Sequence, residues 1–144
     1  MKNPSAQSAA RNALVLLVGS SPQRRSFLAA VLRTIGVESL AVSCCREARE
    51  FLQTHPLLDV ILTDTTLEDA NWSDVLRAVI DCESAASVVV VAPSSADERL
   101  WSEVIWRGGH DLLVEPFSKD EARRVLEGAL RASWGGALTL AAAS

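Results

Sequence analysis

The stretch Leu58-Asp59-Val60-Ile61-Leu62-Thr63-Asp64-Thr65-Thr66 decides the fold of this chain. Its apolar centre, 60–62, has the β-branched and aliphatic side chains of a buried strand. The run ends in a carboxylate, Asp64, and a polar loop follows. In an open parallel sheet, ligands and chemistry collect at the carboxyl ends of the strands. Asp64 is therefore the first candidate functional residue.

Similar apolar runs alternate with helical patterns on both sides of this stretch. We expect strands at 13–18, 37–42, 60–64, 88–92 and 112–114, each followed by a helix. Alternating strands and helices joined by short loops imply a parallel sheet covered by helices on both faces. The predicted fold class is α/β: a doubly wound, five-stranded parallel sheet with five helices, of the flavodoxin-like type.

Capping residues place the starts of these helices. Ser21 followed by Pro22 suits the first helix, and Ser43 is the expected cap of the second. The fourth and fifth helices have capping-box spacings, Ser95 with Glu98 and Ser118 with Glu121. Two apolar stripes are expected to be buried, one on the third helix and one on the fourth: Val75, Leu76, Val79 and Ile80, and Leu100, Trp101, Val104 and Ile105.

Composition limits the class of protein. The chain has 144 residues, 49% of them hydrophobic, which is enough for one domain with its own core. We divide it into a leader, 1–12, a folded domain, 13–132, and a tail or linker remnant, 133–144. The net charge of −4 and the absence of a long apolar run predict a cytoplasmic protein that binds neither nucleic acid nor membrane.

Asp64 and a second motif together carry a family resemblance. Gly-Gly-His-Asp-Leu-Leu-Val-Glu-Pro-Phe, 108–117, ends the fifth predicted strand. With five strand-helix repeats and an Asp ending the third strand, the chain resembles the receiver domain of bacterial two-component response regulators over about 12–132. In that family the Asp that matches Asp64 accepts a phosphoryl group from a histidine kinase. The resemblance implies a non-enzymatic signalling domain.

Other positions of the family's site carry the wrong residues. The acidic pair that holds Mg²⁺ falls on Gly19 and Ser20, the hydroxyl residue on Ala92 and the lysine on Glu115. The aromatic switch position falls on Leu112. Asp64 and the Thr66 carbonyl would be left as the main metal ligands, so Mg²⁺ is expected to bind weakly or not at all. Glu115 also replaces a cation by an anion where a phosphoryl group needs compensation.

These departures favour a pseudo-receiver that acts through protein contacts, with Asp64 kept as a structural carboxylate. One alternative is a genuine phosphoacceptor with a rearranged metal site, for which Glu68 and Asp69 are candidate replacement ligands. An alternative from another class is a flavodoxin-like ligand-binding domain or enzyme. An anion site at 19–22, near Arg24 and Arg25, is weighed against a plain turn and helix cap.

Partner contacts are expected on the fourth helix. Trp101 and Trp106 lie five residues apart, about 140° around a helix, so only one of them can face the sheet. The apolar stripe places Trp101 inside and Trp106 outside, which makes Trp106 a candidate interface residue. The resemblance implies a surface formed by the fourth helix, fifth strand and fifth helix. A histidine kinase, a downstream signalling protein or a second copy would bind there.

Overall fold

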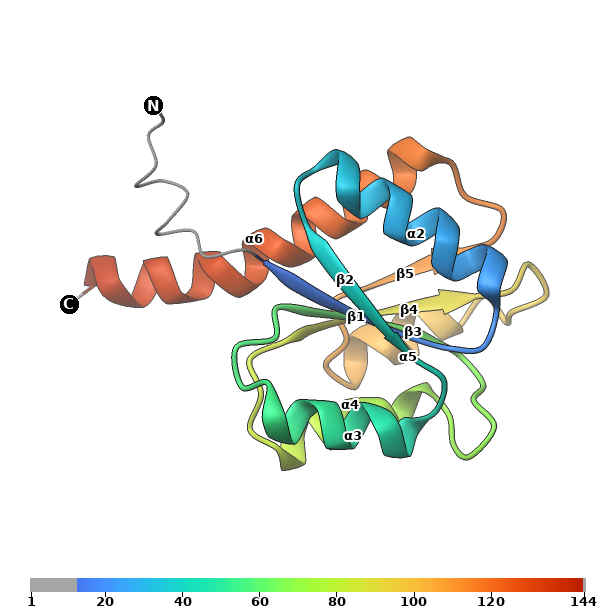
Figure 1. The fold of residues 1–144 in the computed structure, drawn as a ribbon, viewed down its shortest axis with the longest axis horizontal. Helices are drawn as coiled ribbons and strands as arrows, with labels where there is room; N and C mark the ends of the chain where they lie inside the picture. Colours follow the sequence, from blue (N-terminus) through green and yellow to red (C-terminus); the bar gives the residue numbers. More distant parts are fainter. Residues whose placement is uncertain (1–12, 144) are drawn as a thin grey trace.

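A computed structural model describes the backbone of residues 13–143 and the side chains of residues 13–133. Five strands alternate with five helices (Figure 1). In chain order they are β1 (Leu14–Val18), α2 (Pro22–Thr34), β2 (Glu38–Val42), α3 (Cys45–Thr54), β3 (Val60–Asp64), α4 (Trp72–Asp81), β4 (Ser87–Ala92), α5 (Leu100–Trp106), β5 (Asp111–Val114) and α6 (Lys119–Ala143). The predicted fold class is confirmed.

The sheet is parallel throughout, with strand order β2-β1-β3-β4-β5. Helices α2 and α6 cover one face, and α3, α4 and α5 cover the other (Figure 1). The strand β3 lies at the centre and is buried on both faces as far as Thr63, which accounts for its continuous apolar sequence. Asp64 consequently emerges at the carboxyl edge of the sheet, between β1 and β4.

Of three helix caps predicted from the sequence, two are present in the structure and one is not. Ser21 accepts a hydrogen bond from the Arg24 amide, and the Ser118–Glu121 capping box is present. The prediction of Ser43 as a cap is wrong: Cys44 occupies the N-cap position of α3 without a side-chain bond, and the Ser43 hydroxyl donates to Glu47 instead.

The fourth predicted helix starts later than its sequence indicates. The pair Ser95 and Glu98 makes no capping box, because α5 begins only at Leu100, and Asp97 accepts a hydrogen bond from the Arg99 amide just before it. The helix is only seven residues long. Since so short a helix covers little of the sheet, its apolar stripe is less buried than predicted.

Some side chains of the predicted stripes are exposed. In α4, Val75, Leu76 and Val79 are buried, but Ile80 points to solvent. In α5, Val104 is buried, whereas Ile105 and Trp101 are exposed.

The predicted divisions of the chain fall near residues 12 and 132. The backbone of α6 continues as a helix to Ala143, beyond the expected end of the folded domain near 132. The predicted leader, 1–12, and the last residue, Ser144, lie outside the described residues. Among the helices of 13–143, none is long and apolar enough to cross a membrane.

Candidate functional site

Asp64 is engaged by an arginine from another part of the chain. The Arg24 Nη1 donates to Asp64 Oδ1 over 2.6 Å, and the two side chains are 21% and 16% exposed. Arg24 lies in the first turn of α2, directly after the loop that follows β1. Because that loop and the end of β3 meet at the same edge of the sheet, the first turn of α2 brings its guanidinium over the carboxylate.

The same guanidinium binds Glu115. Its Nε and Nη2 donate to Glu115 Oε2 and Oε1 over 3.0 and 2.8 Å, a bidentate pair. Arg24 thus bridges the end of β3 and the loop after β5. Paired N–H donors of this kind form strong, geometrically specific bonds to carboxylates. The position that the resemblance assigns to a lysine is therefore occupied by an anion with its own cation.

The charges of this cluster influence one another. Burial raises the pKa of Asp64 above its ordinary value, and the positive charge and hydrogen bond of Arg24 oppose that rise. Glu115 adds a negative charge that raises the pKa of Asp64 further. The hydrogen bond to Glu115 is the main cause that raises the pKa of Arg24. The guanidinium is consequently a permanent cation placed between two carboxylates.

The Asp64 carboxylate occupies the space that a side chain at Gly19 would need. A Cβ added at Gly19 would lie closer to Asp64 Oδ2 than van der Waals contact allows, and all three carboxyl atoms would crowd it. Asp64 therefore lies against the Gly19 backbone on one side and against Arg24 on the other. Ser20, the second position of the expected acidic pair, is exposed, and its backbone N–H lowers the pKa of Asp64.

The residues present do not fit a magnesium site of the receiver type. Gly19 and Ser20 supply no carboxylate, and Asp64 Oδ1 is bound to Arg24. Thr66 is exposed and pairs with Asn71 in an isolated bridge of the β3–α4 loop. No cluster of three or more His, Cys, Asp or Glu side chains suited to a metal ion occurs among the residues that the structure describes.

The proposed replacement ligands are not both available. Asp69 accepts hydrogen bonds from the backbone amides of Cys45 and Arg46 over 2.9 and 3.0 Å, so its carboxylate caps α3. These bonds lower the pKa of Asp69. Glu68 is exposed in the same loop. Asp69 therefore serves the local structure and ties the loop after Asp64 to the neighbouring helix.

Two further positions of the family's site lie nearby without polar chemistry. Ala92 ends β4 and is fully buried, so no hydroxyl faces the mouth of the sheet there. Leu112 in β5 is partly buried and packs against the core on the α3, α4 and α5 side. Neither residue can hydrogen-bond through its side chain to a group on Asp64.

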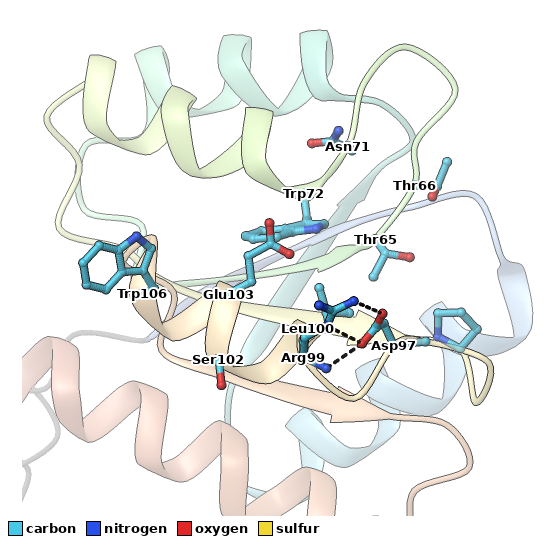
Figure 2. A pocket seen from close by; sticks show the side chains of 12 residues that line it. Thr65, Thr66, Asn71, Trp72, Asp97, Arg99, Leu100, Ser102, Glu103 and Trp106 are labelled. Carbon is cyan, nitrogen blue, oxygen red and sulfur yellow. Dashed lines mark hydrogen bonds and ion pairs between the residues drawn. The ribbon is translucent and has the colours of Figure 1, made fainter.

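A groove lies beside this site, between α4 and α5 (Figure 2). It has a volume of about 1060 Å³, and Trp72 and Trp106 are among the residues that line it. The Glu103 side chain points from α5 toward Trp72, whose ring also lies 5.8 Å from the Arg107 guanidinium carbon. Asp97 and Arg99 form an ion pair at the other end (Figure 2).

Both tryptophans of α5 are accessible. Trp106 is 88% exposed, as predicted, but Trp101 is 53% exposed, and the prediction that it is buried is wrong. They project about 140° apart around the helix axis. Trp106 lines the α4–α5 groove, and Ile105 and Val114 add exposed apolar area on α5 and β5.

Arg24 is a residue of the candidate site that the sequence motifs did not single out. Arg24 lies beside the potential anion site at 19–22, but its guanidinium binds two carboxylates of the chain itself. The predicted Ser21 cap of α2 is present, and the anion site at this loop stays a prediction. The available signal was a charge imbalance: Asp64 and Glu115 would meet at one edge of the sheet, and the expected lysine was missing.

Comparisons with known proteins agree with this architecture. No family model matches the sequence. The chain is 27% identical over 113 residues to two-component response regulator ORR11 of rice, Oryza sativa, covering 77% of this chain and 76% of that protein. A solved signal receiver domain from Vibrio parahaemolyticus has a TM-score of 0.82 at 21% identity, over 89% of this chain and 97% of its own.

A third similar protein is a receiver domain whose structure was solved as a dimer. The beryllofluoride-activated NtrC4 receiver domain dimer has a TM-score of 0.75 at 20% identity, over 83% of this chain and 98% of its own. The chain therefore has the receiver fold, and its sequence resembles that of two-component response regulators.

Proposed function

We propose that this chain is an atypical receiver domain of two-component signalling that acts through protein contacts and does not depend on phosphorylation of Asp64. The receiver fold and the similarity to response regulators support the signalling context. One observation carries the finer proposal: the Arg24 guanidinium binds the Asp64 carboxylate over 2.6 Å and Glu115 at the same time.

This contact opposes phosphoryl transfer in two ways. An Asp oxygen must be free to attack phosphorus, but Oδ1 is bound to Arg24 and Oδ2 lies against Gly19. The charge that develops on a transferring phosphoryl group also requires cations close by. Here the one nearby guanidinium is already shared by two carboxylates, and Glu115 repels an incoming anion. Asp64 then serves as a structural carboxylate that holds α2 against the sheet.

The proposed contact surface lies on α5 and β5. Trp101, Ile105 and Val114 expose apolar area there, and Trp106, also exposed, lines the α4–α5 groove. Aromatic side chains that are exposed in the free protein are frequent anchors of protein interfaces. A histidine kinase, a downstream signalling protein or a second copy of the chain is the proposed partner. Bacterial origin and a cytoplasmic location remain predictions from the sequence.

Incubation with acetyl phosphate and Mg²⁺, followed by intact-mass measurement, tests the proposal. We expect no stoichiometric mass increase of one phosphoryl group in the wild type. A full increase that is absent from Asp64→Asn would show a working acceptor with a rearranged site and would overturn the pseudo-receiver proposal.

The rival class, a ligand-binding domain or enzyme, is tested separately. The α4–α5 groove and the loops after β1, β3 and β4 are where a ligand would bind. A thermal-shift screen with nucleotides and flavins should leave the unfolding temperature unchanged. A reproducible, saturable increase with one of these compounds would favour the rival class.

A further inference from the structure

Three departures from the receiver pattern occur around the Asp64 side chain. A carboxylate is missing at Gly19, an ammonium is missing at Glu115, and a guanidinium from Arg24 has been added. The guanidinium contacts Asp64 through Nη1 and Glu115 through Nε and Nη2. A single cation therefore satisfies both carboxylates at the mouth of the sheet.

Gly19 belongs to the same arrangement. With a side chain at position 19, the Asp64 carboxylate could not lie where Arg24 binds it, because Oδ2 and the new Cβ would overlap. The position from which the resemblance expects a metal ligand is thus the one that must lack a side chain here. Loss of that ligand and gain of the arginine contact are geometrically linked.

We infer that Arg24 is the resident cation of this site, standing in for both the divalent metal and the lysine of a receiver, so that the site is metal-independent. The inference deepens the proposed function and rests on it, because it names what holds the same site in a fixed state. Arg24 connects α2 to the end of β3 and to the β5–α6 loop, so it fixes three elements together.

The chemistry of arginine suits this role. Its planar group offers five N–H donors and matches carboxylates bidentately, whereas Mg²⁺ demands near-octahedral oxygen ligands and gives up water reluctantly. Asp64 and Glu115 alone supply few ligands, and in the wild type their inward oxygens are already bonded to Arg24. A divalent ion in solution would have to displace a guanidinium that is covalently attached to the chain.

Thermal unfolding of the full chain with and without millimolar MgCl₂ or MnCl₂, at ionic strength matched with KCl, tests the inference. The wild type should show no shift in unfolding temperature. Arg24→Ala uncovers two converging carboxylates and should gain about 3 °C on adding Mn²⁺ or Mg²⁺. Arg25→Ala removes the neighbouring positive charge of the same helix and should respond as the wild type does.

A second variant identifies the ligands. Arg24→Ala combined with Glu115→Gln should lose the gain, because one of the two carboxylates is then neutral. If Arg24→Ala does not fold, Arg24→Gln replaces it, since glutamine keeps polar contacts but has no charge. A metal-dependent increase in the wild type equal to that of the Arg24 variant, or no increase in any Arg24 variant, overturns the inference.

The result is separable from the test of the proposed function. Phosphoryl incorporation from acetyl phosphate measures whether Asp64 accepts the group, whereas the metal titration measures which cation occupies the site. A wild type that takes up a phosphoryl group overturns the proposed function, whereas an unmodified wild type that responds to metal as Arg24→Ala does overturns the inference alone.

Discussion

The carboxyl edge of the sheet around Asp64, here called the mouth of the sheet, differs from the surface of α5. Its polar side chains bind one another, whereas the large side chains of α5 face solvent. At the mouth, Asp64, Arg24 and Glu115 are partly buried and bind one another. On α5, Trp101 and Trp106 are 53% and 88% exposed. The sheet edge around Asp64 is closed by internal bonds, whereas the α5 surface that we propose for partner contacts is exposed. The proposed function assigns a structural role to the closed region and partner contact to the exposed one.

Removal of Arg24 should have the largest effect. Arg24→Ala leaves two partly buried carboxylates without their cation, and we expect the free energy of unfolding to fall by about 2–3 kcal/mol, less than for a fully buried pair. Urea denaturation measures the loss. Arg46→Ala, which breaks an exposed pair with Glu50, should leave stability unchanged. Equal losses of unfolding free energy in the two variants would show that the Arg24 ion pairs contribute no more to stability than an exposed surface pair.

The crowding at Gly19 comes next. Gly19→Ala places a methyl group against the Asp64 carboxylate and should cost about 1–2 kcal/mol. In the background of Asp64→Ala, which removes the carboxylate, the same substitution should cost less, and the remaining cost is that of a side chain at the backbone φ of Gly19, +157°. A double-mutant cycle by urea denaturation gives this coupling. Additive effects of the two substitutions would contradict the close contact.

The α5 surface should respond in association and not in stability. If the chain self-associates through this surface, Trp101→Ala should weaken the dimer by about tenfold, as expected when an interface aromatic is truncated. Trp106→Ala should weaken it less, because Trp106 lies toward the α4–α5 groove. Sedimentation velocity over a range of concentrations measures both. A wild type that stays monomeric, with unchanged variants, would remove the proposed self-contact.

The pH dependence of stability should show the smallest effect. Burial raises the pKa of Asp64 in the folded chain above its ordinary value. Between the unfolded and folded pKa values, the folded state binds more protons, so the free energy of unfolding falls as pH rises through that window. Asp64→Asn lacks this titration and should gain stability relative to the wild type from about pH 4 upward.

Urea denaturation of both proteins at several pH values provides the comparison. A relative loss of stability in Asp64→Asn over the same range would mean that Arg24 stabilises the charged carboxylate more than burial opposes it. The sign of this small difference in stability therefore shows whether burial or the Arg24 charge has the larger effect on the pKa of Asp64.

The fold was predictable because local patterns and global topology agree. The strand β3 is a continuous apolar run since both its faces are covered, and Asp64 ends it as expected. Arg24 was not predictable by spacing, because its partners lie 40 and 91 residues away and meet it only across the sheet edge. The exposure of Trp101 was also missed, since a stripe on a helix of seven residues does not guarantee coverage.

The missing side chain at Gly19 also restricts how this domain could change over time. As long as Arg24 holds Asp64 over the Gly19 backbone, an acidic residue gained at position 19 would collide with the carboxylate that it should assist. For position 19 to supply a carboxylate, the Asp64 side chain would first have to leave its present position on Arg24. In the opposite order, the new side chain would be placed against Asp64 while Arg24 still holds it, and the site would be strained.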